Sequence, residues 1–230
     1  MALFAIGDLH LSHNTDKPMD IFGGGWINYV EKLENGFQIL GSDDVCVLCG
    51  DISWGMSLDE SLEDFLFIDR LPGKKIILKG NHDYWWNTVS KMKSFFEKNN
   101  IKSIEILHNN HFCYDGTALC GTRGWLFDDE LSAGQNEKIM TREAIRLRSS
   151  LQSAKDADVR VCFFHYPPRF KNTVCYDIIS VMNEYEVKNC IYGHLHGEGF
   201  RHAVQGSVEG IEYKIVSADF VDFTPQRILL

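Results

Sequence analysis

Short apolar runs recur along this chain, and each run stops at a glycine or at a polar residue. They fall at residues 3–6, 45–49, 76–78, 159–164 and 188–192. Because these runs have no polar face, they are typical of strands that are buried on both sides, as in the interior of a parallel sheet. The pattern therefore predicts an α/β protein built around a sheet.

The segments between these strands repeat apolar residues at helical spacing, every three or four positions. One of the helices opens at Ser57-Leu58-Asp59-Glu60, which has the form of a capping box. Alternating pieces flank the turn Asp115-Gly116 and predict an antiparallel hairpin, and residues 199–217 predict a closing hairpin, so the sheet is expected to be mixed. The predicted helices cover residues 26–40, 57–70, 84–98, 137–157 and 174–185.

The composition supplies ample material for a core, with 44% hydrophobic and 12% aromatic residues among 230. Since no linker, repeat or low-complexity segment interrupts the chain, residues 1–230 are expected to form a single domain. The net charge of -9 disfavours long nucleic acid and membrane surfaces as partners. The first residues lack the basic start of a signal peptide, and no apolar run approaches the ~20 residues of a membrane span. We therefore expect a cytoplasmic protein.

The seven cysteines lie mostly within apolar, strand-like segments, as expected for reduced core thiols. Cys46 and Cys49 have the C-x-x-C spacing of redox and zinc sites. Positions three apart on a strand point to opposite faces, however, so the two thiols could not meet without breaking the strand. We interpret them as core residues.

Five of the predicted strands end at polar clusters, and these clusters carry five of the nine histidines. A single histidine in such a place is explained equally well as a hydrogen-bonded structural residue. Five strands that end in the same way point instead to one shared site, because ligands of open α/β sheets bind at the carboxyl ends of the strands. The clusters are Asp8 with His10, Asp51, Asn81 with His82, His165, and His194 with His196.

As metal ligands, these side chains offer carboxylate, imidazole and amide groups but no thiolate. This mixture suits borderline divalent ions, with Mn²⁺ as the leading candidate and Fe or Zn as alternatives. Seven such side chains are too many for one open site. They divide naturally between two ions that share a bridging carboxylate, which we assign to Asp51.

The chain resembles the calcineurin-like metallophosphoesterases, whose motif set it matches in order over residues 7–197. The matching segments are Gly7-Asp8-Leu9-His10, Gly50-Asp51, Gly80-Asn81-His82-Asp83, His165 and Gly193-His194-Leu195-His196. This resemblance implies a four-layer α/β/β/α sandwich, with two mixed β-sheets flanked by helices. It also implies a binuclear metal-dependent phosphohydrolase that acts on phosphodiesters or phosphomonoesters through a metal-bridging hydroxide.

The resemblance further implies a role for each motif residue. One metal would be held by Asp8, His10 and His196, and the other by Asn81, His165 and His194, with Asp51 between them. His82 would bind no metal but would protonate the leaving alkoxide, which suits an imidazole near its own pKa.

Several residues near these motifs have two possible roles. Asp83 either orients the His82 imidazole or, as we favour, caps a helix that begins at Tyr84. Arg123 either binds a substrate phosphate or is a solvated surface residue. The nearby aromatic residues either stack on a nucleobase or aryl leaving group or, as we favour, belong to the core. They are Trp54, Trp85, Trp86, Trp125 and Tyr166.

The chain departs from the family pattern after the bridging residue. Many relatives carry an aspartate three residues after it, and the Ser/Thr protein phosphatases continue with arginine, whereas Trp54 and Gly55 stand here. This departure disfavours a phosphoprotein substrate and leaves His82 without an assigned partner. The segments that could set specificity, residues 12–25 and 126–135, carry no recognisable code, and the sequence does not indicate an oligomeric state.

The leading alternative function is a catalytically inactive scaffold of this fold that binds metal and protein partners. Such a descendant should have lost the groups that only catalysis requires. His82 is such a group, so its presence favours the enzyme.

Overall fold

The computed structural model describes residues 1–126 and 130–229, and its strands form two large sheets and one short ribbon within these ranges. The first sheet has the order β13-β1-β2-β3-β4 and the second the order β11-β12-β10-β7-β6-β5. In the first sheet the strands are β1 (Leu3–Ile6), β2 (Val45–Leu48), β3 (Lys74–Ile77), β4 (Ile104–Ile106) and β13 (Gln226–Arg227). In the second they are β5 (Phe112–Tyr114), β6 (Thr117–Thr122), β7 (Val159–Phe164), β10 (Asn189–Tyr192), β11 (Gly206–Val208) and β12 (Ile211–Ile215). The ribbon pairs β8 (Arg169–Phe170) with β9 (Thr173–Val174).

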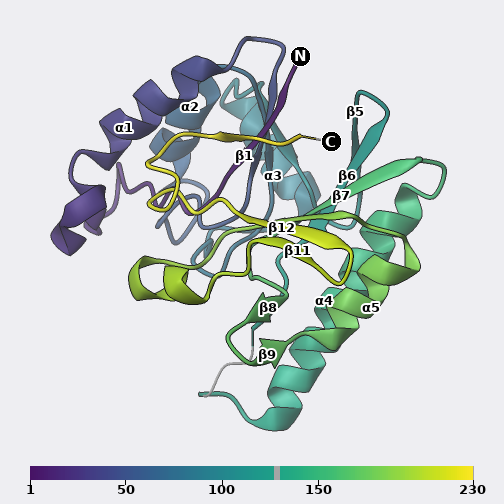
Figure 1. Ribbon diagram of the computed structural model, residues 1–230. Coiled ribbons are helices and arrows are strands. Elements are labelled where there is room, and N and C mark those ends of the chain that lie inside the picture. The colour runs from purple at the N-terminus through teal and green to yellow at the C-terminus, as the bar shows by residue number, and fades with distance from the viewer. Residues whose placement is uncertain (127–129, 230) are drawn as a thin grey trace.

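The two sheets face each other, and helices cover their outer faces (Figure 1). Helices α1, α2 and α3 lie on the first sheet, and α4 and α5 lie on the second. The prediction of a four-layer α/β/β/α sandwich is therefore confirmed. The helices are α1 (Tyr29–Gly36), α2 (Leu62–Arg70), α3 (Val89–Lys98), α4 (Ala133–Ser153) and α5 (Tyr176–Glu184), with 3-10 turns at Met19–Phe22, Gly24–Trp26, Phe37–Ile39 and Gly197–His202.

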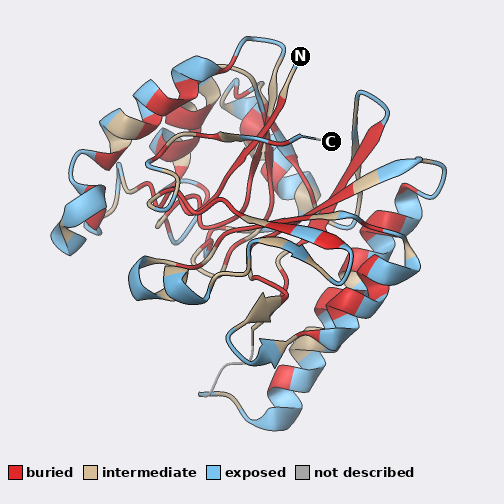
Figure 2. Ribbon diagram, in the orientation of Figure 1, coloured by how far each residue is buried: buried red, intermediate tan, exposed pale blue. Residues whose placement is uncertain are grey.

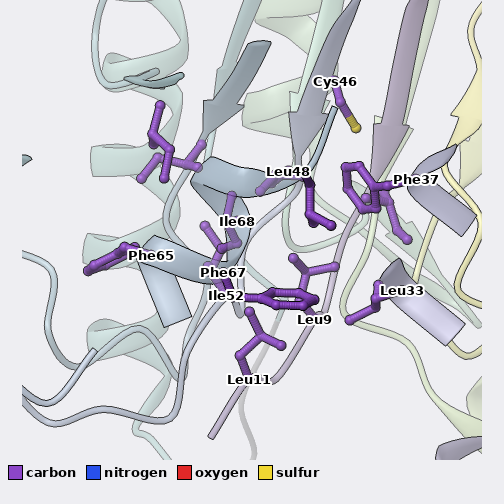
Figure 3. Packing of buried hydrophobic residues seen from close by; sticks show 14 of the residues in the cluster. Leu9, Leu11, Leu33, Phe37, Cys46, Leu48, Ile52, Phe65, Phe67 and Ile68 are labelled. Atoms are coloured by element: carbon purple, nitrogen blue, oxygen red, sulfur yellow. The ribbon is translucent and has the colours of Figure 1, made fainter. Parts of the chain in front are cut away.

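The central strands β1, β2 and β3 of the first sheet are buried on both faces over most of their length, as Figure 2 shows for the centre of the molecule. Leu3 and Ala5 of β1 point into the core between the sheets, and Phe4 and Ile6 point toward the helices. The two-fold repeat of a strand therefore explains why these runs contain no polar position. Figure 3 shows part of the helix-side core, where side chains of β2, α1 and α2 meet.

The interpretation of Cys46 and Cys49 as core residues is confirmed. Cys46 belongs to the helix-side core and Cys49 to the core between the sheets, so the two thiols point to opposite faces. All seven cysteines are free, and burial raises the pKa of both Cys46 and Cys49. Neither thiol is placed for redox chemistry or for zinc.

Both sheets are mixed, as predicted, because antiparallel strands stand at their edges. Strands β1 to β4 run parallel to one another, and β13 joins β1 antiparallel. Strands β6, β7, β10 and β12 are also parallel, and the two predicted hairpins add β5 and β11 antiparallel at either edge. Because β12 is parallel to β10, its carboxyl end lies at the same edge as the other strand ends.

Four predicted helix starts are wrong by three to five residues. The helices expected from residues 26 and 137 begin at Tyr29 and Ala133. The helix expected from Ser57 begins at Leu62, because Ser57 and Glu60 form a turn before it, in which the Glu60 side chain accepts from the Met56 N–H. The helix expected from Tyr84 begins at Val89, with Thr88 as its N-cap. Among residues 1–126 and 130–229 there is no helix that could serve as a membrane span.

Candidate metal centre

The carboxyl ends of β1, β2, β3, β7 and β10 meet at one place between the two sheets, and they bring the seven predicted ligand side chains together. Backbone hydrogen bonds join these ends: the Asp8 N–H donates to the Gly50 carbonyl at 2.9 Å, and the Gly193 N–H donates to the His165 carbonyl at 3.2 Å. Two groups of side chains could each hold a metal ion here. One consists of Asp8, His10 and His196, and the other of Asp8, Asp51 and His165.

The first group gathers around Asp8 and His10. The Nε2 atoms of His10 and His196 lie 3.4 Å apart, and His196 Nε2 lies 3.7 Å from Asp8 Oδ1. His10 Nε2 is also 3.7 Å from Asp51 Oδ2. Two imidazole nitrogens and two carboxylates therefore face a common point.

The second group gathers around His165. Its Nε2 atom lies 2.6 Å from Asn81 Oδ1, 3.2 Å from His194 Nδ1 and 3.5 Å from Asp51 Oδ2. Asp51 Oδ2 thus faces both groups, as a bridging ligand requires. The division of the ligands between two ions remains a prediction. The side chains are grouped in the way that this division requires.

Hydrogen bonds orient two of the imidazoles. His165 Nδ1 lies 3.0 Å from the Cys49 carbonyl, which can only accept, so this nitrogen carries the proton. Burial lowers the pKa of His165 to about 3, so its ring is neutral and Nε2 presents a lone pair to the oxygens of Asn81 and Asp51. His196 Nδ1 is held in the same way, 2.8 Å from Asp219 Oδ1. Such partners fix the tautomer of a ligating histidine.

The backbone is strained at four of the predicted ligands. Asp8, His10, Asp51 and His194 have φ values of 59°, 46°, 51° and 71°, in the left-handed region that residues with a side chain rarely adopt. Each such residue costs on the order of 1–3 kcal/mol and persists only where its surroundings enforce it. Other residues of the chain also have positive φ, but four such residues among seven predicted ligands are typical of a functional site.

Two glycines make room for the carboxylates. A Cβ atom at Gly80 would lie 2.1 Å from Asp51 Oδ1, and one at Gly193 would lie 2.4 Å from Asp8 Oδ2. No other residue fits at either position without displacing a carboxylate. The glycines of the Gly-Asn-His-Asp and Gly-His-Leu-His motifs thus serve the predicted ligands directly.

The electrostatics of the site fit a cation. Burial, together with the charge of Asp51, raises the pKa of Asp8 to about 8, and burial raises that of Asp51 to about 6. Asp8 Oδ1 is buried without a hydrogen-bond partner, and the His165 lone pair faces two oxygens. Carboxylates and lone pairs that face one another are stabilised by a proton or by a cation between them. The residues present therefore fit divalent cations.

Asp83 neither caps a helix nor contacts the His82 ring, so the cap favoured from the sequence is wrong. The carboxylate is fully buried and accepts from the N–H groups of Asp51 and Ile52, at 3.0 and 2.8 Å. It also accepts from the Gly80 N–H at 2.7 Å and from Trp85 Nε1 at 3.0 Å. Asp83 therefore ties the turn after β2 to the turn after β3.

An Asp83→Asn substitution is expected to lower the free energy of unfolding by about 3 kcal/mol, because an amide NH₂ would face buried N–H donors. It should also weaken metal binding, since the two turns carry Asp51 and Asn81. Chemical denaturation and metal analysis measure the two effects. As a control, Asp69→Asn removes a carboxylate that accepts from the N–H groups of Lys102 and Ser103, and should leave the metal content unchanged. Equal metal loss in both variants would contradict this role for Asp83.

His82 lies beside the ligand groups. Its backbone N–H donates to Asp51 Oδ1 at 2.8 Å, and its ring centroid lies 4.4 Å from that of Trp54 and 5.7 Å from that of His10. Its Nδ1 atom lies 3.5 Å from the Tyr84 hydroxyl. Trp54, the residue that departs from the family pattern, therefore packs against His82.

Arg123 lies in a neighbouring cluster. Its guanidinium lies over the Trp125 ring, 5.1 Å from the centroid, and 3.7 Å from the buried carboxylate of Glu143. Its backbone carbonyl accepts from the N–H groups of His165 and Tyr166. The backbone of Arg123 is thus hydrogen-bonded to that of the predicted ligand His165. Arg146 also pairs with the Glu143 carboxylate.

Two residues that contact the site are not among those predicted from the sequence. Trp26 packs edge-on against His10, with ring centroids 5.8 Å apart, and Asp219 holds His196. Asp219 had a weak signal, because it lies shortly after strand β12, whose end lies at the same edge as the other strand ends. Trp26 stood at the start of the helix predicted for residues 26–40, where an apolar residue indicates only packing. Among the aromatic residues near the motifs, for which a core position is favoured from the sequence, Trp85 is buried in the core.

A model of the family described as calcineurin-like phosphoesterase matches residues 1–198 of the chain. No curated protein matches it. Solved structures share the fold at low identity. A protein of unknown function from Aquifex aeolicus has 18% identity and a TM-score of 0.52, with 98% of this chain and 95% of that chain covered. The phosphopantetheinyl hydrolase of Mycobacterium tuberculosis has 15% identity and a TM-score of 0.57, with 99% and 95% covered. A protein from Thermus thermophilus has 11% identity and a TM-score of 0.56, with 98% and 97% covered.

Proposed function

Because this chain belongs to the calcineurin-like phosphoesterase family, we propose that it hydrolyses phosphomonoesters or phosphodiesters at a two-metal site. The observation that carries the proposal is the grouping of seven ligand-type side chains around Asp51 Oδ2, which faces both His10 and His165. The distant likeness to a phosphopantetheinyl hydrolase is in keeping with phosphoester chemistry but does not identify the substrate.

In this proposal, one ion is held by Asp8, His10 and His196, the other by Asn81, His165 and His194, and both by Asp51. Mn²⁺ is the leading candidate, with Fe or Zn as alternatives, because the donors combine oxygen with imidazole nitrogen. When bound, the cations lower the pKa of water and neutralise the phosphate oxygens.

His82 is the proposed proton donor to the leaving oxygen. Its N–H is anchored on Asp51, while its ring lies against Trp54 outside the ligand groups. When water attacks the phosphorus and the ester bond breaks, the departing alkoxide takes a proton from the protonated His82 ring, which is left as a neutral imidazole. Packing on Trp54 restricts the ring to positions next to the site, which gives His82 the partner that the sequence left unassigned.

Arg123 is the proposed contact for a phosphate oxygen. We expect Arg123→Met to raise KM about tenfold while changing kcat little, because a charge-assisted hydrogen bond would be lost from bound substrate and transition state alike. Arg146→Met is the matched control, since it removes the other arginine on Glu143. Steady-state kinetics of the two variants give the comparison, and equal KM values would remove Arg123 from the substrate site.

The experiment that tests the function is a hydrolysis screen with Mn²⁺-loaded protein, using p-nitrophenyl phosphate, bis-p-nitrophenyl phosphate and a wider panel of phosphoesters. We expect metal-dependent turnover that a chelator abolishes and that metal restores. If no phosphoester is turned over while the metals are bound, the alternative of an inactive scaffold replaces the proposal.

A further inference from the structure

A cavity of about 600 Å³ opens directly beside the proposed site. Its inner wall contains the rings of His10, His82 and His196. Its other walls are largely apolar and come from segments far apart in the sequence, among them Met19 and Phe22 of one loop and Phe200 of another. A volume of this size is typical of sites that enclose a small organic ligand.

The tryptophans of this cavity are already engaged. Trp26 is 7% exposed and packs against His10, Tyr29 and Phe223. One contact of Trp54 is with the stacked ring of His10, 5.0 Å away, and another is with the Lys17 ammonium at 5.0 Å. The apolar surface most open to a ligand is instead on Phe22, which is 68% exposed, and on the half-buried Phe200.

The residues that line the cavity carry little charge, although the Lys17 ammonium lies beside the lining residue Trp54. No Lys or Arg lies among the described residues that line it, and its one acid, Asp219, is hydrogen-bonded to His196. Next to Phe22, Gly23 and Gly24 have φ values of 64° and 54°, and a Cβ atom at either would meet nothing within 4 Å. The loop therefore leaves open space beside the apolar side chains.

We propose that this cavity binds an apolar group on the alcohol that leaves the phosphorus. The inference rests on the proposed function, because it places the leaving oxygen next to His82, which lines the cavity. An apolar occupant would be favoured, because it would be removed from water against the apolar side chains of Met19, Phe22 and Phe200. The substrate class is thus a phosphoester of an apolar alcohol, either alkyl or aryl.

The test compares the hydrolysis of methyl, n-hexyl and phenyl phosphate by Mn²⁺-loaded protein, with the matching methyl diesters for a diesterase. We expect kcat/KM for the hexyl ester to exceed that of the methyl ester by at least about tenfold, because the two alcohols are similarly acidic and differ mainly in apolar surface. Phenol is a better leaving group, so an alkyl and an aryl preference are distinguished by binding of the phosphonates rather than by rate. Calorimetric titration with hexylphosphonate, phenylphosphonate and methylphosphonate, which are not hydrolysed, reports binding without turnover.

Phe22→Ser and Phe200→Ser are expected to weaken binding of the preferred larger phosphonate about tenfold and to leave methylphosphonate binding and metal content unchanged. Ile145→Ser removes an apolar side chain of similar exposure on α4 and should change none of these values. Equal kcat/KM for the methyl and hexyl esters, with both Phe variants unaffected, would overturn the inference and leave the proposed function standing. Failure to hydrolyse even the methyl esters and the p-nitrophenyl esters would instead remove the proposed function.

Discussion

His82→Ala is expected to lower kcat by roughly 10²- to 10⁴-fold, which is the usual effect of removing a general acid. The metal content should not change, because the ring of His82 lies outside both ligand groups and only its backbone N–H contacts Asp51. The loss should be largest for esters of alcohols with high pKa and smallest for p-nitrophenyl esters, because p-nitrophenolate leaves without a proton. Steady-state kinetics and elemental analysis of the same preparation measure both effects.

The matched control is His111→Ala, which removes a histidine hydrogen-bonded to Ser153 rather than to a residue of the site. It should keep the activity of the unchanged protein. Loss of both metals in His82→Ala would make His82 a ligand, and an equal loss of rate for all leaving groups would exclude it as the proton donor.

Asp51→Asn is expected to reduce the bound metal to one ion or none and to lower the rate at least roughly 10³-fold. An amide carries no charge to share between two cations, so the Lewis acidity of the pair, worth several kcal/mol of transition-state stabilisation, would be lost. Because the side chain keeps its size, the fold should survive the change. Metal analysis, phosphoesterase assays and circular dichroism test these three expectations.

Asp156→Asn gives the control, since this exposed aspartate lies outside the metal centre. It should bind metal and turn over substrate as the unchanged chain does. Should Asp51→Asn retain both ions and full rate, the carboxylate at position 51 would not be a bridge.

The features that could be predicted from the sequence are those that depend on local pattern. The runs at residues 3–6 and 159–164 coincide with β1 and β7, because a strand segment buried on both faces, such as residues 3–6 and 161–164, is apolar throughout. The side chains that follow these strands meet because parallel strands end at one edge. The seven candidate ligands could therefore be assembled without coordinates, whereas their roles still depend on a family resemblance.

The features that could not be predicted depend on contacts between distant segments. Asp83 looked like a helix cap, but its acceptors are filled by N–H groups of the turn after β2, about thirty residues away in sequence. Asp219 could not be predicted from the hairpin pattern of residues 199–217. Strand β12 pairs with β10 as well as with β11, and this pairing brings the residues after β12 to the site. The cavity is lined by segments far apart in the sequence, residues 19–26 and 196–200 among them. Of residues 126–135, the second segment that could set specificity, residues 127–129 lie outside the described residues.

The most direct test of the two-metal account is the metal content of the unchanged chain, measured by elemental analysis after loading with Mn²⁺ and removal of free ions. A two-metal centre should hold two equivalents of Mn²⁺ per chain, and the affinity for each ion should depend on whether the other ion is bound. One equivalent or fewer at saturation would contradict the two-metal account.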